Sequence, residues 1–207
     1  MNSNSSKATL YYIHDPMCSW CWGFRPVWQQ VLEKLPKQIK VQYVLGGLAP
    51  DSDAAMPQDM QLSIAATWQM IQKEIPGTQF NFDFWNHCLP RRSTYPACRA
   101  VIAATKQNPA AETEMLLAIQ QAYYLRAENP SDYPTLIDLA EPIGLDKEQF
   151  ASDILSDEVE QILQQNIKLA HSMYVYSFPS LILERNGQQE AIKIDYNDAD
   201  KILQQIF

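Results

Sequence analysis

The sequence predicts an α/β fold in which a long helical segment interrupts the sheet. Two apolar, strand-like runs, at residues 10–13 and 39–45, flank a helical pattern near the start of the chain. Residues 50–174 then contain almost no strand pattern. Strand-like runs return on both sides of Asn186-Gly187, a dipeptide typical of a two-residue hairpin loop, and a final helix follows. The predicted order is therefore β-α-β, a block of helices, and β-β-α.

The first part of the chain reads as a β-α-β unit. Residues 10–13 lack polar alternation, as expected for a strand that is covered on both faces. A helix is predicted over residues 19–35, and Pro26 within it predicts a kink or a break. The second strand, residues 39–45, is expected to run parallel to the first through a right-handed crossover and to end at Gly46-Gly47.

The middle of the chain reads as a helical domain, because its apolar residues are periodic and it contains no low-complexity run. Helices are expected around residues 62–70 and over 97–106, 112–125, 133–143, 147–155 and 158–173. Asp146 and Gln149 predict a capping box. Strands over 175–183 and 191–194 and a helix over 197–207 follow. We therefore expect a core made of residues 8–49 and 175–207, with residues 50–174 as the inserted domain.

Two cysteines, Cys18 and Cys21, are predicted to lie in the first turn of the first helix. The free N–H groups and the positive end of the helix dipole stabilise an anion there, and the thiolate is the form that attacks disulfides. A structural zinc site needs four ligands, and the nine residues between Cys88 and Cys98 are not a usual zinc spacing. A C-x-x-C pair near a β-α-β pattern favours redox chemistry over a metal site or two incidental core cysteines.

Composition limits the classes of partner. The formal net charge of −8 argues against nucleic acid or an anionic membrane as the main partner. No run of about 18 apolar residues is present, and residues 1–7 lack the pattern of a secretory signal. A cytoplasmic location is therefore expected. There, a disulfide is more often catalytic than structural.

Four motifs resemble those of DsbA-like oxidoreductases, which have a thioredoxin fold. They are Asp-Pro-Met-Cys-Ser-Trp-Cys-Trp-Gly at 15–23, Ser-Thr-Tyr-Pro-Ala-Cys-Arg-Ala at 93–100, Gly-Leu-Asp at 144–146 and Ser-Phe-Pro-Ser at 177–180. The resemblance covers about residues 8–206 and is nearest to the cytoplasmic FrnE-like branch. That branch is related to the 2-hydroxychromene-2-carboxylate isomerases and the kappa-class glutathione transferases. The predicted element order fits a thioredoxin fold with a helical domain inserted after the second strand.

The resemblance implies thiol–disulfide exchange, with Cys18 as the nucleophile and Cys21 as the resolving thiol. It also implies that Pro179 is the cis-proline facing the pair, and that Phe178 beside it can pair with an extended substrate. Ser93, Thr94 and Tyr95 resemble the helical-domain segment that faces the active site, so substrate contact is expected there. The dipeptide between the thiols, Ser19-Trp20, matches neither that of the strongly oxidising DsbA proteins nor that of thioredoxin. The redox potential of the pair is therefore not predicted more narrowly than about −120 to −270 mV.

The expected function is dithiol–disulfide oxidoreduction on protein or small-thiol disulfides. It needs no metal or nucleotide, and glutathione is a candidate reductant or substrate. One alternative is a glutathione-dependent isomerase or transferase, although those proteins typically have Ser where a second Cys stands here. Another is a redox-sensitive holdase chaperone. The substrate, the direction of electron flow and the oligomeric state stay open.

The exposure expected for the two cysteines and for the nearby tryptophans depends on the role of each residue. Cys18 is expected to be the exposed thiol and Cys21 the shielded one. Trp20 and Trp22 are expected to be at least partly exposed as an apolar landing surface, whereas Trp28 is expected in the core.

His14 is interpreted as a strand-end residue, exposed or bonded to backbone, rather than as a cation that tunes Cys18. Cys88 and Cys98 are interpreted as small core residues, although a second disulfide between them stays open.

Overall fold

The computed structural model describes residues 8–207, a mixed four-stranded sheet surrounded by helices. The first unit is β1 (Ala8–His14), α1 (Ser19–Lys34) and β2 (Ile39–Leu45), and the last is β3 (Ser180–Arg185), β4 (Gln188–Ile192) and α9 (Ala199–Ile206). Between them lie α2 (Gln58–Glu74), α3 (Phe84–His87), α4 (Tyr95–Gln107), α5 (Ala111–Leu125), α6 (Tyr133–Asp138), the 3₁₀ helix η1 (Glu141–Ile143), α7 (Lys147–Asp153) and α8 (Asp157–Ser172). The predicted order of elements is confirmed.

The sheet has the strand order β2-β1-β3-β4. β1 pairs with β2 in parallel, and both β1–β3 and β3–β4 are antiparallel. Asn186 and Gly187 have φ values of 53° and 77°, which suit a tight turn between β3 and β4. The predicted hairpin and the predicted parallel crossover are therefore both present.

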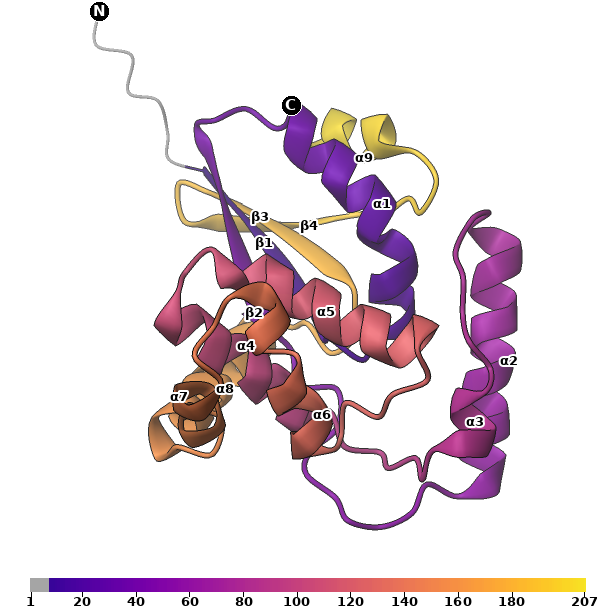
Figure 1. Cartoon of the computed structure of the whole chain (residues 1–207). Coiled ribbons are helices and arrows are strands. Elements are labelled where there is room, and N and C mark those ends of the chain that lie inside the picture. The colour runs from indigo at the N-terminus through magenta and orange to yellow at the C-terminus, as the bar shows by residue number, and fades with distance from the viewer. Residues whose placement is uncertain (1–7) are drawn as a thin grey trace, which may run out of the picture.

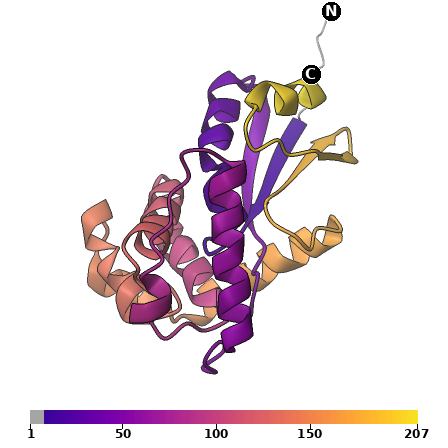
Figure 2. The same cartoon turned by 90° about the vertical axis from the view of Figure 1, so that its right-hand side faces the viewer.

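The two faces of the sheet are covered by different helices (Figures 1 and 2). Tyr12 and Leu183 pack with α1 and α9 on one face. Ile13 and Ile182 point the other way and pack with Ala170 of α8. Neighbouring residues of a strand point to opposite faces, so β1 contributes to both cores at once. This explains its continuous apolar sequence.

Helices α2 to α7 form a second body of packed helices below and beside the sheet in Figure 1. Its core includes Trp68, whose ring stacks on Phe80 at a centroid distance of 4.9 Å. Met17 and Trp22, which flank the cysteine pair, are buried in the same core. The helical segment therefore packs against the loop and helix that carry Cys18 and Cys21.

Several boundaries differ from the prediction. Helix α1 continues through Pro26 without the expected break, because Phe24, Val27 and Trp28 around it are buried against the sheet. The single helix expected over 133–143 is wrong: α6 ends at Asp138 and a 3₁₀ turn follows, with a proline in its first turn. Helix α3 was not predicted.

Two other local predictions have mixed outcomes. Strand β3 begins only at Ser180, directly after Pro179, rather than at residue 175. Only one of the two hydrogen bonds of the predicted capping box forms. Asp146 accepts the Gln149 N–H at 2.8 Å, but the Asp146 N–H donates to Gln107 instead of Gln149.

Candidate active site

Cys18 is the N-cap residue of α1, with extended backbone angles. The Cys21 N–H donates to the Cys18 sulfur at 3.3 Å, and the Cys18 N–H donates to the Asp15 carbonyl at 3.0 Å. The sulfur thus occupies the place of a capping side chain over the free N–H groups of the helix. The expected location, at the junction of a strand and the start of a helix, is confirmed.

Both thiols are more covered than the sequence suggests. Cys18 is 6% exposed and Cys21 is 1% exposed. The prediction of an exposed Cys18 is therefore wrong, although Cys18 remains the more accessible of the two. Burial, followed by the neighbouring Cys18, raises the pKa of the Cys21 thiol well above its usual range.

The loop before β3 covers Cys18. The Phe178–Pro179 peptide bond is cis, as predicted, and the Cys18 thiol donates to the Phe178 carbonyl at 3.2 Å. The Phe178 ring packs directly against Gly46 at the end of β2, where a Cβ atom would lie only 2.0 Å from the ring. Phe178 therefore contacts Cys18 through its carbonyl and the end of β2 through its ring.

Asp15 is a site residue that the sequence reasoning missed. Its carboxylate is fully buried and accepts hydrogen bonds from the Met17 N–H at 2.8 Å, the Leu48 N–H at 2.7 Å and the Thr94 hydroxyl at 2.7 Å. Burial raises the pKa of Asp15, and these donors act in the opposite direction. An aspartate that caps the turn before Cys18 could have been suspected from the Asp-Pro dipeptide.

Ser93 and Thr94 lie close behind this turn. Both are buried, and the Thr94 hydroxyl also accepts the Ala49 N–H at 3.1 Å. The Ser93 hydroxyl accepts the Ser52 N–H at 3.2 Å. The Thr94 side chain therefore holds the Asp15 carboxylate, and both side chains hold the segment that follows β2. Their expected contact with substrate stays a prediction.

The tryptophans near the pair have different surroundings. Trp20 is half-buried, with its ring 5.0 Å from that of Tyr196. Trp22 is buried, stacks on Tyr124 and donates its indole N–H to the Gln79 carbonyl at 3.0 Å. The expectation that Trp22 offers an exposed landing surface is wrong, because the helical segment covers it. Trp28 is buried, as expected.

His14 is buried, which contradicts the predicted exposed or backbone-bonded side chain. Its ring stacks on Tyr12 at 5.0 Å and meets Tyr43 edge-on at 5.7 Å. Neither ring nitrogen has a hydrogen-bond partner within residues 8–207. Burial lowers the pKa of His14 to about 3, so the ring is neutral at physiological pH and cannot act as a cation near Cys18.

Cys88 and Cys98 are free thiols in different places. The Cys88 thiol donates to the Ala127 carbonyl at 3.1 Å, and Cys98 is buried with its sulfur 3.5 Å from the Asp15 carboxylate. Both therefore fit the interpretation as small packed residues. In the part of the chain that the structure describes, no group of three or more His, Cys, Asp or Glu side chains is arranged to hold a metal ion.

A family model for thioredoxin matches residues 11–205 of this chain. The chain belongs to the thioredoxin family. It is similar to a candidate protein disulfide isomerase from Nitrosomonas europaea, at 27% identity and a TM-score of 0.84, covering 97% of this chain and 96% of that one. It also shares the fold of the cytosolic disulfide reductase DsbM from Pseudomonas aeruginosa, at 23% identity and a TM-score of 0.76, covering 96% of both chains. The predicted DsbA-like fold is confirmed.

One curated relative is described as an adapter protein and not as an oxidoreductase. The ClpXP adapter protein SpxH of Bacillus subtilis is 27% identical over 188 residues, which cover 89% of this chain. The match covers 61% of that protein, so this chain spans less than two thirds of its length. Separately, no helix within residues 8–207 has both the length and the apolar character needed to cross a bilayer.

Proposed function

We propose that this protein is a thiol–disulfide oxidoreductase that acts through the Cys18–Cys21 pair. The observation that carries the proposal is the place of the Cys18 sulfur, between the Cys21 N–H and the Phe178 carbonyl. The N–H groups of α1 stabilise a thiolate at this place. The carbonyl beside it is a backbone acceptor for an extended substrate, and Pro179 adds no competing N–H.

The proposed reaction has two exchanges. The Cys18 thiolate attacks a substrate disulfide, forms a mixed disulfide and releases one substrate sulfur as a thiolate. Cys21 then attacks the Cys18 sulfur, which releases the second substrate sulfur and leaves Cys18 and Cys21 oxidised. The reverse sequence oxidises a substrate dithiol and restores both cysteines. The two cysteines suffice for either direction, so the proposal includes no metal or nucleotide.

Protein disulfides and small-thiol disulfides are both proposed as substrates, in a cytoplasmic location. Glutathione is the proposed small thiol. Support comes from the structure of Pseudomonas aeruginosa DsbM, a cytosolic disulfide reductase, with GSH, which shares this fold at 22% identity and a TM-score of 0.74. The complete cysteine pair weighs against the isomerase or transferase alternative.

A second candidate function is a binding role in proteolysis. It is favoured by one observation, the 27% identity to an adapter protein of ClpXP. An adapter acts by holding another protein, so this role would not depend on electron transfer between Cys18 and Cys21. The holdase alternative shares that property.

Trapping of mixed disulfides tests the proposed enzyme. Cys21→Ser should accumulate a mixed disulfide with oxidised glutathione or a disulfide-bonded protein, because Cys18 attacks and nothing resolves. Cys18→Ser is the matched control and should trap none. Mass spectrometry identifies the adduct and its site. Equal trapping by the two variants, or an adduct at Cys88, would contradict the assigned roles.

The variant with both Cys18 and Cys21 changed to Ser separates the candidate functions. Insulin-disulfide reduction with glutathione should fall to the uncatalysed rate in this variant. A binding function would survive the change, and suppression of aggregation or adapter-dependent degradation measures it. Titration of the wild-type pair against glutathione, followed by Trp20 fluorescence, gives the potential that decides the direction of electron flow.

A further inference from the structure

Two neighbouring residues compete to cap the start of α1. Serine is strongly preferred at the N-cap position of helices, and cysteine is not. Cys18 nevertheless occupies this position, and its sulfur accepts the Cys21 N–H at 3.3 Å. Ser19 follows as the first helical residue. If Ser19 were the cap, the Trp22 N–H, which donates to the Cys18 carbonyl at 3.1 Å, would turn to the Ser19 hydroxyl. Cys18 would then lie outside the helix.

The Ser19 hydroxyl is engaged by the helical segment instead. Trp68 of α2 donates its indole N–H to the Ser19 oxygen at 2.9 Å. The Trp68 side chain is 0% exposed, and its ring stacks on Phe80 at 4.9 Å and meets Tyr124 edge-on at 5.5 Å. A buried indole N–H without an acceptor is costly. The packed Trp68 ring therefore keeps the Ser19 hydroxyl bonded to α2 and not to the backbone of the first turn.

Two further contacts fix the first turns of α1 against the same part of the helical segment. The Trp22 indole N–H donates to the Gln79 carbonyl at 3.0 Å. A Cβ atom at Gly23 would lie 2.7 Å from the Ile75 side chain, so the absence of a side chain there allows α1 and α2 to lie this close. Ser19, Trp22 and Gly23 are three and four residues apart and share one face of α1. The helical segment therefore docks on the face that carries Ser19.

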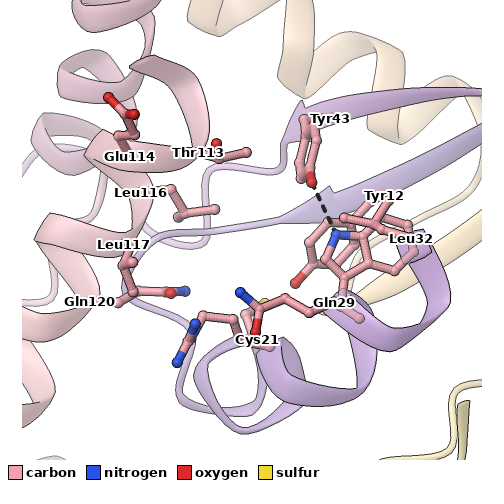
Figure 3. A pocket seen from close by; sticks show the side chains of 12 residues that line it. Tyr12, Cys21, Gln29, Leu32, Tyr43, Thr113, Glu114, Leu116, Leu117 and Gln120 are labelled. Atoms are coloured by element: carbon pink, nitrogen blue, oxygen red, sulfur yellow. Dashed lines mark hydrogen bonds between the residues drawn. The ribbon is translucent and has the colours of Figure 1, made fainter. Parts of the chain in front are cut away.

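The two cysteines differ in what surrounds them. Cys21 lines a mostly apolar cavity of about 280 Å³ between α1, β1, β2 and α5 (Figure 3), and Cys18 does not. On its other side Cys18 meets the Phe178 carbonyl, which is an acceptor and cannot stabilise an anion. The stabilisation of a Cys18 thiolate therefore depends on the N–H groups at the start of α1.

We propose that Trp68 is a positioning residue that makes Cys18 the cap of α1, because its N–H holds the competing Ser19 hydroxyl. This inference rests on the proposed thiol–disulfide exchange, in which the Cys18 thiolate attacks the substrate. With Ser19 engaged, the N–H of the first turn is directed at the Cys18 sulfur and stabilises the thiolate. Loss of the Trp68 N–H frees Ser19 to cap the helix, and the Cys18 sulfur then loses its donor. The helical segment thus acts on the nucleophile through Ser19.

Labelling and redox equilibria of a set of variants test this inference. Trp68→Phe keeps an aromatic ring and removes the N–H. The rate at which iodoacetamide labels Cys18 at neutral pH should fall about tenfold or more, the size expected for one hydrogen bond to a charged group. The equilibrium constant for reduction of the Cys18–Cys21 disulfide by glutathione should also fall, because the thiolate stabilises the reduced form. Adding Ser19→Ala to Trp68→Phe should restore both quantities, because alanine does not cap.

Trp85 provides the matched control. Its ring lies 4.9 Å from that of Trp68 in the same aromatic core, and its indole N–H has no hydrogen-bond partner within residues 8–207. Trp85→Phe makes the same change of side chain and should keep the wild-type labelling rate and equilibrium constant. If circular dichroism shows that Trp68→Phe does not fold, β-(3-benzothienyl)alanine at position 68 takes its place, since this residue keeps the two-ring shape and lacks the N–H.

Each other outcome has a definite meaning. A wild-type labelling rate in Trp68→Phe would overturn the inference. So would a loss that Ser19→Ala does not restore, or equal slowing in Trp85→Phe, because the effect would then come from repacking of the core. Slow labelling in Ser19→Ala alone would also overturn it, because Ser19 would then support the thiolate itself. Wild-type protein that shows the expected labelling pattern but reduces no insulin disulfides would overturn the proposed function, and the role of Trp68 in capping would stand.

Discussion

Replacing His14 with Phe should make the protein more resistant to acid. His14 is buried between the rings of Tyr12 and Tyr43, and its two nitrogens lack partners within residues 8–207. Phe retains an aromatic ring at this position and removes the titrating group. The variant therefore tests whether a neutral, buried imidazole limits the stability of the strand that leads to Cys18.

The magnitude follows from the pKa of His14, which is about 3 in the folded protein against 6.5 for an ordinary histidine. Between these two values the unfolded chain binds a proton that the folded chain does not. The free energy of unfolding is therefore complete above pH 6.5 and falls as the pH drops toward 3. At pH 5 the unfolded chain is about 1.5 pH units below its pKa, which corresponds to a loss of about 2 kcal/mol.

Urea denaturation at pH 8 and pH 5, followed by tryptophan fluorescence, measures this loss. Wild-type protein should lose about 2 kcal/mol more than His14→Phe between the two pH values. Phe is larger than His, but overpacking shifts the stability by the same amount at both pH values. The exposed His171 provides the matched control, and His171→Phe should show the wild-type pH dependence.

Parallel losses of stability in wild-type protein and in His14→Phe would refute this reasoning. They would mean that the folded protein protonates His14 as readily as the unfolded chain does. The same result would reopen the interpretation of His14 as a cation that acts on Cys18.

Three other predictions concern the active-site loop. Asp15→Ala should lower the free energy of unfolding, measured by urea denaturation, by about 2–4 kcal/mol, because the N–H groups of Met17 and Leu48 lose their acceptor. A variant as stable as the wild-type protein would contradict this. Gly46→Ala should slow the alkylation of Cys18 or change its redox potential, because the added Cβ atom displaces the Phe178 ring. A structure of the variant in which the Phe178 carbonyl stays 3.2 Å from the Cys18 sulfur would contradict this. Iodoacetamide at neutral pH should label Cys18 first, since burial raises the pKa of Cys21, Cys88 and Cys98; peptide mass spectrometry that finds another cysteine labelled earlier would reverse the order.

Features that depend on near neighbours in the chain were predictable. The hairpin at Asn186-Gly187 and the Asp146 cap need only the conformational preferences of a few consecutive residues. The start of α1 at the cysteine pair belongs to the same class. The order of strands and helices followed from hydrophobic periodicity, and the topology followed from the resemblance of four short motifs.

Features that depend on packing between distant segments were not predictable. The interruption between α6 and η1 was missed because periodicity alone does not locate the end of a short helix. Trp22 was expected to be available to substrate, but the helical segment covers it. Pro26 was expected to break α1, but burial of its neighbours outweighs the one hydrogen bond that a proline removes.

The sequence by itself determined the place of Cys18 and Cys21 at a helix N-terminus, because that place is encoded within a few adjacent residues, and the resemblance supplied the cis peptide bond before Pro179. Only the tertiary structure decided the surroundings of the pair. It brought Leu48 and Thr94 to Asp15, and the Phe178 carbonyl to Cys18. The physical reason is that burial and the pairing of polar groups depend on which distant segments meet, and these properties control the pKa of a thiol.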